Sequence, residues 1–472
     1  MRGWRFRQYD FVTAFLNADM DDFEVYIEQP KAMEVQDQED KVCLLKKSLY
    51  GLHQAPHEWN STLHRYLLTL GFKRCEKDYG LYIKWVEEDD GSQVVIFLTI
   101  YVDDLILLGP DYLAEPVAQS LKSEFKTTDM GDLRYLSGIE IDYVPGKWIM
   151  FSQANFIMDI IKKFGNENMN PVATPQGKEK EPPRRTKEDD LMTKAYPYRS
   201  LIGCLQYLIT GSRLELVNVV RVLSKYLNDY TVAHWKMALR VLKYLLGTVN
   251  HGLVFDLREA MKYDALCIET WVDSDWANDE EDRRSITGYI TKLNGCTITS
   301  KGEKQEVLGT STCHAETIAA STAARDIRWM EQLLRECLLP CAPSSLIIDN
   351  QGAERLCNHP GKHKRRKHIE VRHLYARECV EKHGLRTFTV ASSENLADMN
   401  TKALSKDRFL EACLNIGIMD TKTILNEQPM RENRVEQGNV HHVSEKANTR
   451  NYSKIEEARM RIAQIYGSTK VR

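Results

Sequence analysis

The sequence lacks a long hydrophobic run. Its longest apolar stretch, Val94–Val102, is shorter than the roughly 18 to 20 residues that a membrane-spanning helix needs, and it ends at two aspartates. The arginine-containing stretch Met1–Asp10 has no apolar segment of the kind that forms a secretory signal peptide. We therefore expect no association with a membrane.

The sequence also lacks a strong net charge and a cysteine framework. Lys plus Arg number 64 against 67 Asp plus Glu, so the net charge of −3 indicates no partner by itself. A nucleic-acid binder of this balance must cluster its basic groups and gather its acids at metal sites. Of the 11 cysteines only Cys337 and Cys341 lie close together, without a second pair or suitably spaced histidines to complete a zinc site. An odd number of scattered cysteines in a long chain predicts reduced thiols and therefore an intracellular location.

What remains is ordinary globular composition over several domains. The 472 residues, 43% of them hydrophobic, are too many for one small core and indicate two or three domains. The pattern of apolar residues predicts five segments: a mixed block of strands and helices at 1–175, a charged, proline-containing linker at 176–194, a helical block at 195–260, an alternating strand and helix block at 265–418, and a polar tail at 419–472.

Individual elements follow from β-branched runs and helical spacing. The first block predicts strands at Arg5–Asp10, Asp78–Trp85 and Val94–Val102 and a helix at Pro56–Gly71. The last block predicts the following strands in order, with a long helix at His314–Cys337 after the third: Leu266–Val272, Ser285–Leu293, Cys296–Ser300, Leu346–Asp349 and Arg386–Ala391.

A first group of acids lies in the first block. Asp103 and Asp104 follow the strand Val94–Val102 directly, and the apolar pattern resumes after them, which predicts a hairpin with both carboxylates at its tip. Asp10 ends an earlier strand and can stand beside that turn. Acids next to an apolar run are costly unless a cation neutralises them, and two Mg²⁺ ions held there could activate a 3′-hydroxyl. Taken alone, an Asp pair is more often a solvated turn.

A second group of acids lies in the last block. Asp273 ends its first strand, Glu316 falls in the first turn of the long helix, Asp349 ends a later strand, and Asp398 falls in the first turn of the last helix. Four acids converging at one rim of a sheet would repel one another unless two divalent cations, about 3.5–4 Å apart, lay between them to activate water. Each acid alone also fits a helix N-terminal charge or a surface group, and Asp275 is a rival for the first position.

Short sequence motifs, in a fixed order along the chain, surround both groups of acids. Four motifs resemble the reverse transcriptase of copia-type LTR retrotransposons: DFVTAFLN at Asp10–Asn17, YIEQP at Tyr26–Pro30, KSLYGLHQAP at Lys47–Pro56 and YVDD at Tyr101–Asp104. The later motifs resemble the same polymerase and the ribonuclease H domain that follows it: Met130–Leu133, Gly138–Ile141, Tyr198–Gly203, Tyr244–Thr248, Val272–Ala277, Arg284–Tyr289, His314–Glu316, Asp349–Gly352, Lys367–Glu370, and Asn395–Asp398 with Thr401 and Lys402. The resemblance extends over roughly residues 4 to 418.

This resemblance implies a fold class, α+β and α/β multidomain: a right-hand polymerase palm, then a helical thumb and connection, then a ribonuclease H-like α/β domain. It implies RNA template, DNA primer, RNA–DNA hybrid and deoxynucleoside triphosphates as partners, with two Mg²⁺ or Mn²⁺ ions at each active site. Phe15 matches the aromatic residue that selects deoxynucleotides by sterics, and Gln54 the residue that touches the incoming nucleotide. The catalytic and metal-binding acids it implies are Asp10, Asp103 and Asp104 in the palm, and Asp273, Glu316, Asp349 and Asp398 in the nuclease.

A basic cluster between the third and fourth nuclease acids is a candidate for binding the hybrid. Its six positive charges are enough to neutralise several phosphates and to make affinity depend strongly on salt. The alternative is a solvated loop or a targeting-like basic segment. The residues are Lys362, Lys364, Arg365, Arg366, Lys367 and Arg372.

The chain departs from the family pattern in places. His53 and His57 stand where the family usually has Lys and Arg, and no histidine lies just before Asp398 at 391–394. Only nine residues precede Asp10, whereas the family has a fingers region there, so we expect a truncated polymerase half that extends primers poorly. Two alternatives stay open: a nuclease only, or a catalytically silent nucleic-acid-binding relic. The resemblance predicts a cytoplasmic location in virus-like particles, with the nucleus as an alternative.

Overall fold

The computed structural model describes most of the chain before residue 425. The predicted basic cluster, most of the predicted linker and most of the C-terminal tail lie outside the described residues. Within the part that is described, no helix is long and apolar enough to cross a membrane, and all eleven cysteines are free thiols. The described residues are 4–424 without 21–22, 32–33, 39, 166–167, 178–183, 186–195, 264, 280, 359–373 and 421–423.

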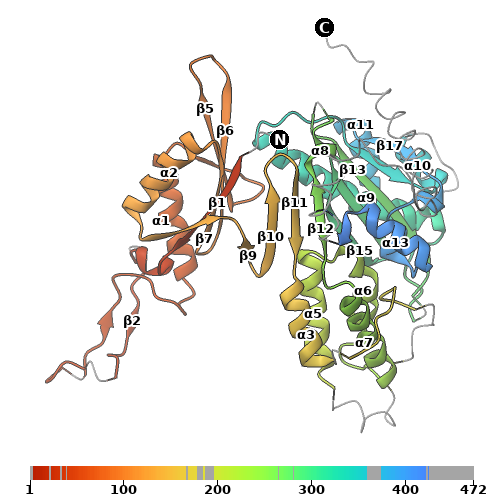
Figure 1. Cartoon of the computed structure of the whole chain (residues 1–472), viewed down its shortest axis with the longest axis horizontal. Helices are drawn as coiled ribbons and strands as arrows, with labels where there is room; N and C mark the ends of the chain where they lie inside the picture. Colours follow the sequence, from red (N-terminus) through yellow and green to blue (C-terminus); the bar gives the residue numbers. More distant parts are fainter. Residues whose placement is uncertain are drawn as a thin grey trace, which may run out of the picture. The chain divides into compact units, whose positions relative to one another are not determined.

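The first block folds as a six-stranded sheet with two helices, α1 (Ala55–Thr69) and α2 (Asp111–Glu124), beside it (Figure 1). Apolar residues on one stripe of each helix, such as Trp59 and Leu63 in α1 and Val117 and Leu121 in α2, are buried in one core with the strands. A 3₁₀ helix, η1 (Ala14–Asn17), and a small pair, β2 (Tyr26–Ile27) and β3 (Cys43–Leu44), lie outside the sheet. The sheet has the order β4 (Lys73–Arg74), β5 (Leu81–Glu87), β6 (Gln93–Tyr101), β7 (Asp104–Gly109), β1 (Arg5–Phe11) and β8 (Thr127–Asp132).

The turn between β6 and β7 carries the Asp pair, and both aspartates are half-buried. Tyr101 pairs with Asp104, so Val102 and Asp103 form a two-residue turn, and Val102 has a left-handed backbone with φ of 57°. Two-residue hairpin turns require positive φ because only then does their twist match that of the strands. The predicted hairpin is therefore present, with Asp103 at its tip.

A second sheet joins strands from distant parts of the chain. It has the order β18 (Ile418–Asp420), β12 (His251–Asp256), β11 (Trp148–Ser152), β10 (Ile139–Val144) and β9 (Tyr135–Leu136). The block 195–260, which we expected to be helical, therefore also contains a strand, β12, which pairs with β11 of the first block. The surrounding core is formed mainly by the helices α3 (Ala154–Phe164), α5 (Tyr198–Gly211), α6 (Val217–Ser224), α7 (Val232–Gly247) and α13 (Lys406–Asn415), with η3 (Leu214–Leu216) and α8 (Leu257–Ala260) in the connections.

The third sheet carries the last block. Its order is β15 (Cys296–Lys304), β14 (Ile286–Leu293), β13 (Ile268–Asp275), β16 (Ser345–Ile348) and β17 (Arg386–Thr389), with β16 parallel to both of its neighbours. The long helix α9 (Thr312–Glu336) packs on it through small residues such as Ala319, Ala320 and Ala323, which allow close approach. The remaining helices are α10 (Gln351–Asn358), α11 (Tyr375–His383), η5 (Ser392–Glu394) and α12 (Asp398–Thr401). The predicted fold class is confirmed, and so is the predicted order of the strands and the long helix in the last block.

Several strand boundaries differ from the prediction, and β15 for example extends four residues beyond the expected Ser300. The strand expected from Asp78 begins at Leu81, because the Asp78 side chain accepts a 2.9 Å hydrogen bond from the Gly80 amide and closes a turn first. The strand expected to end near Asp273 continues to Asp275, which still pairs with Ile286 of the neighbouring strand.

Two helix boundaries and the start of the tail also differ. Helix α9 begins at Thr312 because the Ser311 side chain caps it, so Glu316 lies one turn inside the helix. Asp398 begins the short helix α12 and not the last helix α13. The tail expected from residue 419 begins later, because Met419 and Asp420 belong to β18, which pairs with β12.

Candidate active sites

The first acidic cluster lies at the turn between β6 and β7. Asp10 in β1 pairs with Asp104 at the start of β7, and the carbonyl of Asp103 accepts a 2.9 Å hydrogen bond from the amide of Phe11. Burial, and then the negative charges of Asp103 and Asp104, raise the pKa of Asp10. The structure thus brings the three predicted palm acids together.

Two side chains that sequence reasoning missed hold these acids. The Tyr50 hydroxyl donates to Asp103 Oδ2 at 3.2 Å, and Gln8 Nε2 donates to Asp104 Oδ1 at 3.2 Å. Gln8 could have been found, because alternate residues of a strand share a face and it stands two before Asp10. The second oxygen of Asp103, Oδ1, is buried and has no hydrogen-bond partner among the described residues. A buried carboxylate oxygen without a donor is suited to a cation.

The two predicted nucleotide-binding residues have different surroundings. Phe15 in η1 packs its ring 4.6 Å from the ring of Tyr50, and its carbonyl accepts a 2.6 Å hydrogen bond from Ser48 Oγ. Phe15 is therefore linked to the acids through Tyr50. Gln54 lies at the N-terminal end of α1, and no hydrogen bond among the described residues joins its side chain to the acids.

The second acidic cluster lies at one rim of the third sheet. Asp273 lies in β13, Asp349 follows the adjacent parallel strand β16, and Asp398 begins α12. One carboxylate oxygen of each lies within 4.8 Å of those of the other two. Burial, and then the nearby charges of Asp398 and Asp349, raise the pKa of Asp273 to about 6, although Lys402 and Thr401 favour its ionised form.

Glu316 completes this cluster from helix α9. Its Oε1 accepts a 3.3 Å hydrogen bond from the amide of Ser274, whereas its Oε2 is buried without a hydrogen-bond partner among the described residues. Burial, and then the charges of Asp273 and Asp349, raise the pKa of Glu316 well above its ordinary value. The structure thus brings all four predicted nuclease acids together.

Three residues near the C-terminal end of this block hold the acids in place. The Thr401 hydroxyl donates to Asp273 Oδ2, the Lys402 ammonium lies 2.7 Å from Asp398 Oδ1, and Arg408 Nη2 donates to Asp398 Oδ2 at 2.9 Å. Thr401 and Lys402 belong to a motif of the family resemblance, but sequence reasoning assigned none of the three residues a role. Lys402 could have been found, because it follows Asp398 by one helical turn.

Asp275, the rival of Asp273, lies outside the group of three close carboxylates. It is the second residue after Asp273 on the same strand and shares its face. Burial raises the pKa of Asp275, although the positive charges of Lys402 and Arg221 act in the opposite direction. Asp275 therefore belongs to the surroundings of the cluster.

Both clusters fit hard divalent cations. They offer only carboxylate oxygens as potential ligands, which suit Mg²⁺ and Mn²⁺ better than metals that prefer nitrogen or sulfur. Each contains a buried oxygen that no described donor satisfies, on Asp103 in one and on Glu316 in the other. Burying such an oxygen without a partner costs free energy, and a bound cation would offset that cost.

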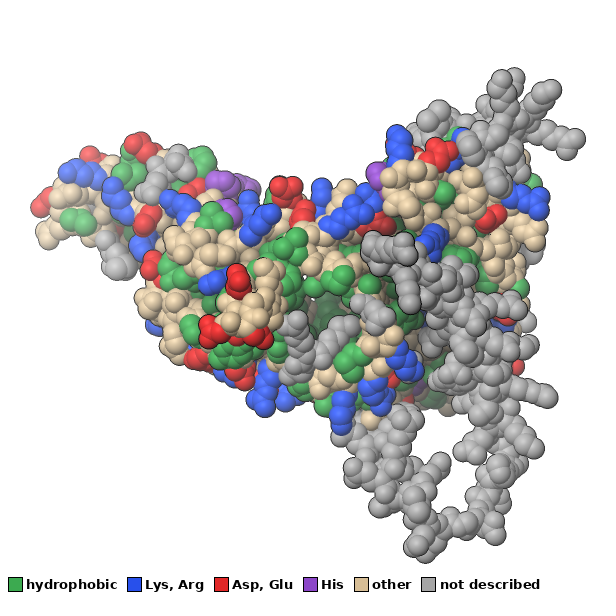
Figure 2. All heavy atoms as spheres, turned by 90° about the horizontal axis from the view of Figure 1, so that it is seen from above, with side chains coloured by type: hydrophobic (Ala, Val, Ile, Leu, Met, Phe, Trp, Pro, Cys, Tyr) green, Lys and Arg blue, Asp and Glu red, His purple; other side chains and the backbone are tan. Residues whose placement is uncertain are grey.

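The predicted basic cluster at 362–372 lies outside the described residues, so its position relative to the acids is not among the observations. On the face seen in Figure 2, Lys and Arg side chains of the described residues are interspersed with Asp and Glu. This mixture agrees with the small net charge of −3.

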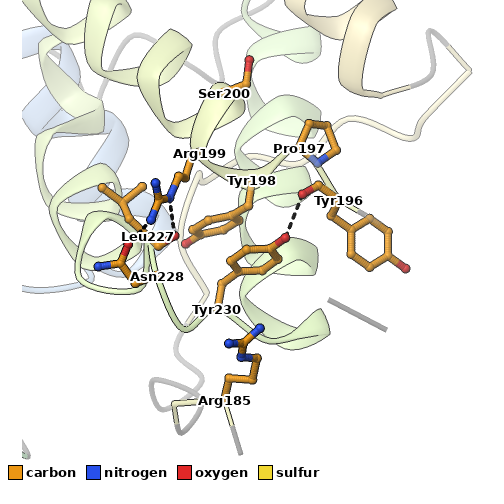
Figure 3. Close-up of a pocket in the computed structure, with 9 residues that line it drawn as sticks. All are labelled: Arg185, Tyr196, Pro197, Tyr198, Arg199, Ser200, Leu227, Asn228 and Tyr230. Atoms are coloured by element: carbon orange, nitrogen blue, oxygen red, sulfur yellow. Dashed lines mark hydrogen bonds between the residues drawn. The ribbon is translucent and has the colours of Figure 1, made fainter. Parts of the chain in front are cut away.

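A pocket of about 430 Å³ in the helical part of the chain is separate from both clusters (Figure 3). Its wall includes the stacked rings of Tyr198 and Tyr230, 4.5 Å apart. The Tyr230 hydroxyl donates to the carbonyl of Tyr196 at 2.8 Å, and Arg199 Nε donates to the carbonyl of Leu227 at 3.0 Å. None of the seven acids lines this pocket.

Comparison with known proteins agrees with the family resemblance of the sequence motifs. Residues 1–178 match the family model described as reverse transcriptase (RNA-dependent DNA polymerase). The chain is 33% identical over 420 residues to the retrovirus-related Pol polyprotein from transposon RE2 of Arabidopsis thaliana, covering 89% of this chain and 28% of that protein. It is 31% identical over 413 residues to the corresponding polyprotein from transposon TNT 1-94 of Nicotiana tabacum, covering 86% of this chain and 30% of that protein.

The chain thus spans less than a third of the length of these two curated relatives. Among solved structures it is similar to the foamy viral protease–reverse transcriptase in complex with double-stranded DNA, with a TM-score of 0.44 and 13% identity over 82% of this chain and 68% of that one.

Proposed function

The chain belongs to the copia-type retrotransposon Pol family, with a reverse transcriptase segment at residues 1–178, and on this premise we propose its function. It is an RNA-directed DNA polymerase joined to a ribonuclease that cuts the RNA strand of RNA–DNA hybrids. Each activity uses two divalent cations, Mg²⁺ or Mn²⁺, held by one of the two acidic clusters. The partners are an RNA template, a DNA primer, deoxynucleoside triphosphates and the hybrid product.

The nuclease proposal rests on one observation above all. Asp273, Asp349 and Asp398, which are far apart in sequence, have carboxylate oxygens within 4.8 Å of one another at a buried rim, with Glu316 beside them. Such a group of acids has no stabilising role of its own, because like charges in a buried site repel. Bound cations would supply an activated water and would stabilise the oxygen that leaves the scissile phosphate.

The residues of the chain orient this site. Thr401 holds one oxygen of Asp273, and Arg408 holds one oxygen of Asp398 while it also donates to the carbonyls of Ser392 and Ser393, at 3.2 and 3.3 Å. Arg408 therefore ties the loop before Asp398 to the acid itself. This loop lacks the histidine that many ribonucleases H have, so proton transfer and product release proceed without it.

The polymerase proposal rests on Asp10, Asp103 and Asp104, with Tyr50 orienting one oxygen of Asp103. A cation bound at the free Oδ1 of Asp103 would bring a primer 3′-hydroxyl and a triphosphate together. Phe15, packed against Tyr50, is placed to exclude a 2′-hydroxyl by sterics.

Cleavage of labelled RNA in a hybrid tests the nuclease. With Mg²⁺ or Mn²⁺, the full chain is expected to cut hybrid RNA and to leave single-stranded RNA largely intact. Asp349→Asn removes one charge and keeps the shape of the side chain, so it should lower the rate by about two orders of magnitude or more. Asp275→Asn is the matched control, because it removes a neighbouring acid outside the close group and should cost less than about tenfold. Intact hybrid after incubation with a folded, metal-binding chain would contradict the proposal.

Primer extension on an RNA template tests the polymerase separately. Any deoxynucleotide addition by the full chain should require a divalent cation and should be abolished by Asp103→Asn. Asp349→Asn is the control, because it should leave extension unchanged. Hybrid cleavage without any extension would limit the function to the nuclease.

A further inference from the structure

Two basic side chains, Arg408 and Lys402, neutralise Asp398, and they differ in their other contacts. Arg408 reaches one oxygen of this buried carboxylate and is also bound to two backbone carbonyls. Lys402 reaches the other oxygen at 2.7 Å, and its ammonium also lies 3.8 Å from Asp273 Oδ2. Arg408 is therefore anchored to the backbone, whereas among the described residues the ammonium of Lys402 contacts acids only.

The ammonium of Lys402 lies among the oxygens that we assign to the metal. Asp273 and Asp398 belong to the group whose oxygens lie within 4.8 Å of one another, and both are in ionic contact with Lys402. A third acid, Asp275, adds its negative charge to the surroundings of this ammonium. A divalent cation among the same oxygens would repel a positive charge so close to it.

Lys402 is free to move away. Its side chain is 41% exposed, whereas that of Asp398 is 2% exposed, so the ammonium stands between the buried acids and solvent. A lysine has a flexible stem of four carbons and a compact charge, so it can exchange one anion for another without moving the backbone. The anion that a hybrid presents at this rim is a backbone phosphate.

We propose that Lys402 is an exchangeable counter-cation of the nuclease site: it neutralises Asp398 and Asp273 when metal is absent, is displaced when a divalent cation binds, and then contacts a phosphate of the hybrid. This inference rests on the proposed nuclease function. It assigns Lys402 two opposing effects, since the residue competes with the metal and supports binding of the nucleic acid.

Metal binding is the first measurement. Mn²⁺ is titrated calorimetrically into the full chain without nucleic acid, in an Asp103→Asn, Asp104→Asn background that removes the palm site. Lys402→Met should bind Mn²⁺ about fivefold more tightly, the range expected when a partly exposed ion pair no longer competes. Lys406→Met is the matched control, because Lys406 is exposed and forms no ion pair with the acids among the described residues, and it should leave the affinity unchanged.

Hybrid binding is the second measurement, and here Lys402→Met should lower the affinity instead of raising it. Fluorescence anisotropy of a labelled hybrid is measured with Ca²⁺, an oxygen-binding cation, in the same background. Lys402→Met should weaken binding about threefold and should reduce the slope of log affinity against log salt by about one. Lys402→Arg should keep the hybrid affinity, because it keeps the charge.

The outcomes separate this inference from the function on which it rests. If the reference chain binds no Mn²⁺, or if Asp349→Asn leaves its affinity unchanged, the nuclease site itself is wrong. If Mn²⁺ binds and Lys402→Met does not tighten it, or if the hybrid affinity is unaltered, the exchange role is overturned and the proposed function still stands. A loss of both affinities would mean that Lys402 only supports the fold.

Discussion

Two buried aspartates in the nuclease block should respond to neutralisation in opposite directions. Asp273 and Asp279 are each 3% exposed. Burial and the neighbouring acids raise the pKa of Asp273 to about 6. Burial would raise the pKa of Asp279 as well, but hydrogen bonds from Lys225 and Lys304, each with its ammonium 3.1 Å from Oδ2, hold it well below its ordinary value.

The magnitudes follow from these surroundings. A folded-state pKa of about 6 against 3.8 for the exposed group means that ionised Asp273 costs the apo fold about 3 kcal/mol at pH 7.5. Asp273→Asn should therefore stabilise the apo protein by up to this amount, and the gain should vanish as the pH falls from 6 to below 4. Asp279→Asn leaves two lysines without their buried partner, and we expect a loss of about 1–3 kcal/mol, reduced from the value for a fully buried pair because Lys304 retains Asp282.

The stability change caused by Asp279→Asn is opposite in sign to that caused by Asp273→Asn, and it also depends on pH. A depressed pKa contributes stability above the unfolded value of 3.8, and that stability is lost as the pH falls toward the folded pKa. The cost of Asp279→Asn should therefore be largest at neutral pH and should shrink in acid.

Local unfolding can be followed by hydrogen exchange of peptides from β13 and β14, in a chelating buffer at pH 7.5, with thermal unfolding at pH 7.5 and 4.5 as the second assay. Asp273→Asn should slow exchange and Asp279→Asn should accelerate it. Addition of Mn²⁺ should protect the unmodified chain more than the Asp273→Asn variant. If both variants destabilise the apo protein at pH 7.5, repulsion among the acids is not a significant term and the reasoning fails.

Three further results are expected. Tyr50→Phe removes the donor to Asp103 and should lower primer extension by about tenfold in single-turnover incorporation, without a change in melting temperature, since Tyr50 is 52% exposed. Phe15→Ala should raise incorporation of ribonucleotides relative to deoxynucleotides in the same assay, and an unchanged ratio would refute the steric role. Glu215→Gln should cost about 3–5 kcal/mol in thermal unfolding because it leaves the fully buried Arg213 without its ionic partner, whereas replacing both by apolar residues should recover most of the loss.

Local signals in the sequence were sufficient for the hairpin in the first block and for the order of the strands and the long helix in the last block. The β-branched run at 94–102 followed by Asp103 and Asp104 specifies a buried strand and a polar turn, because both features depend on residues adjacent in sequence. The helical spacing of Trp59, Leu63 and Leu67 specifies which face of α1 is buried for the same reason. The seven acids could be named because each stands at or near the end of a predicted strand or the start of a predicted helix.

Boundaries and strand partners depended on tertiary structure. Whether Asp275 continues a strand depends on the partner residue Ile286, and pairing across a sheet is not encoded within one segment. The second sheet is the clearest case, because β18 and β12 pair although more than 150 residues separate them in the chain. Their short segments have no periodicity that would indicate a common sheet.

The sequence by itself therefore determined which carboxylates are present and on which elements they lie. The tertiary structure decided which atoms meet them: Gln8 and Tyr50 at the palm acids, and Lys402 and Arg408 at Asp398. The physical reason is that a hydrogen bond or ion pair requires distances of about 3 Å between side chains, and only the packed arrangement of distant segments sets such distances.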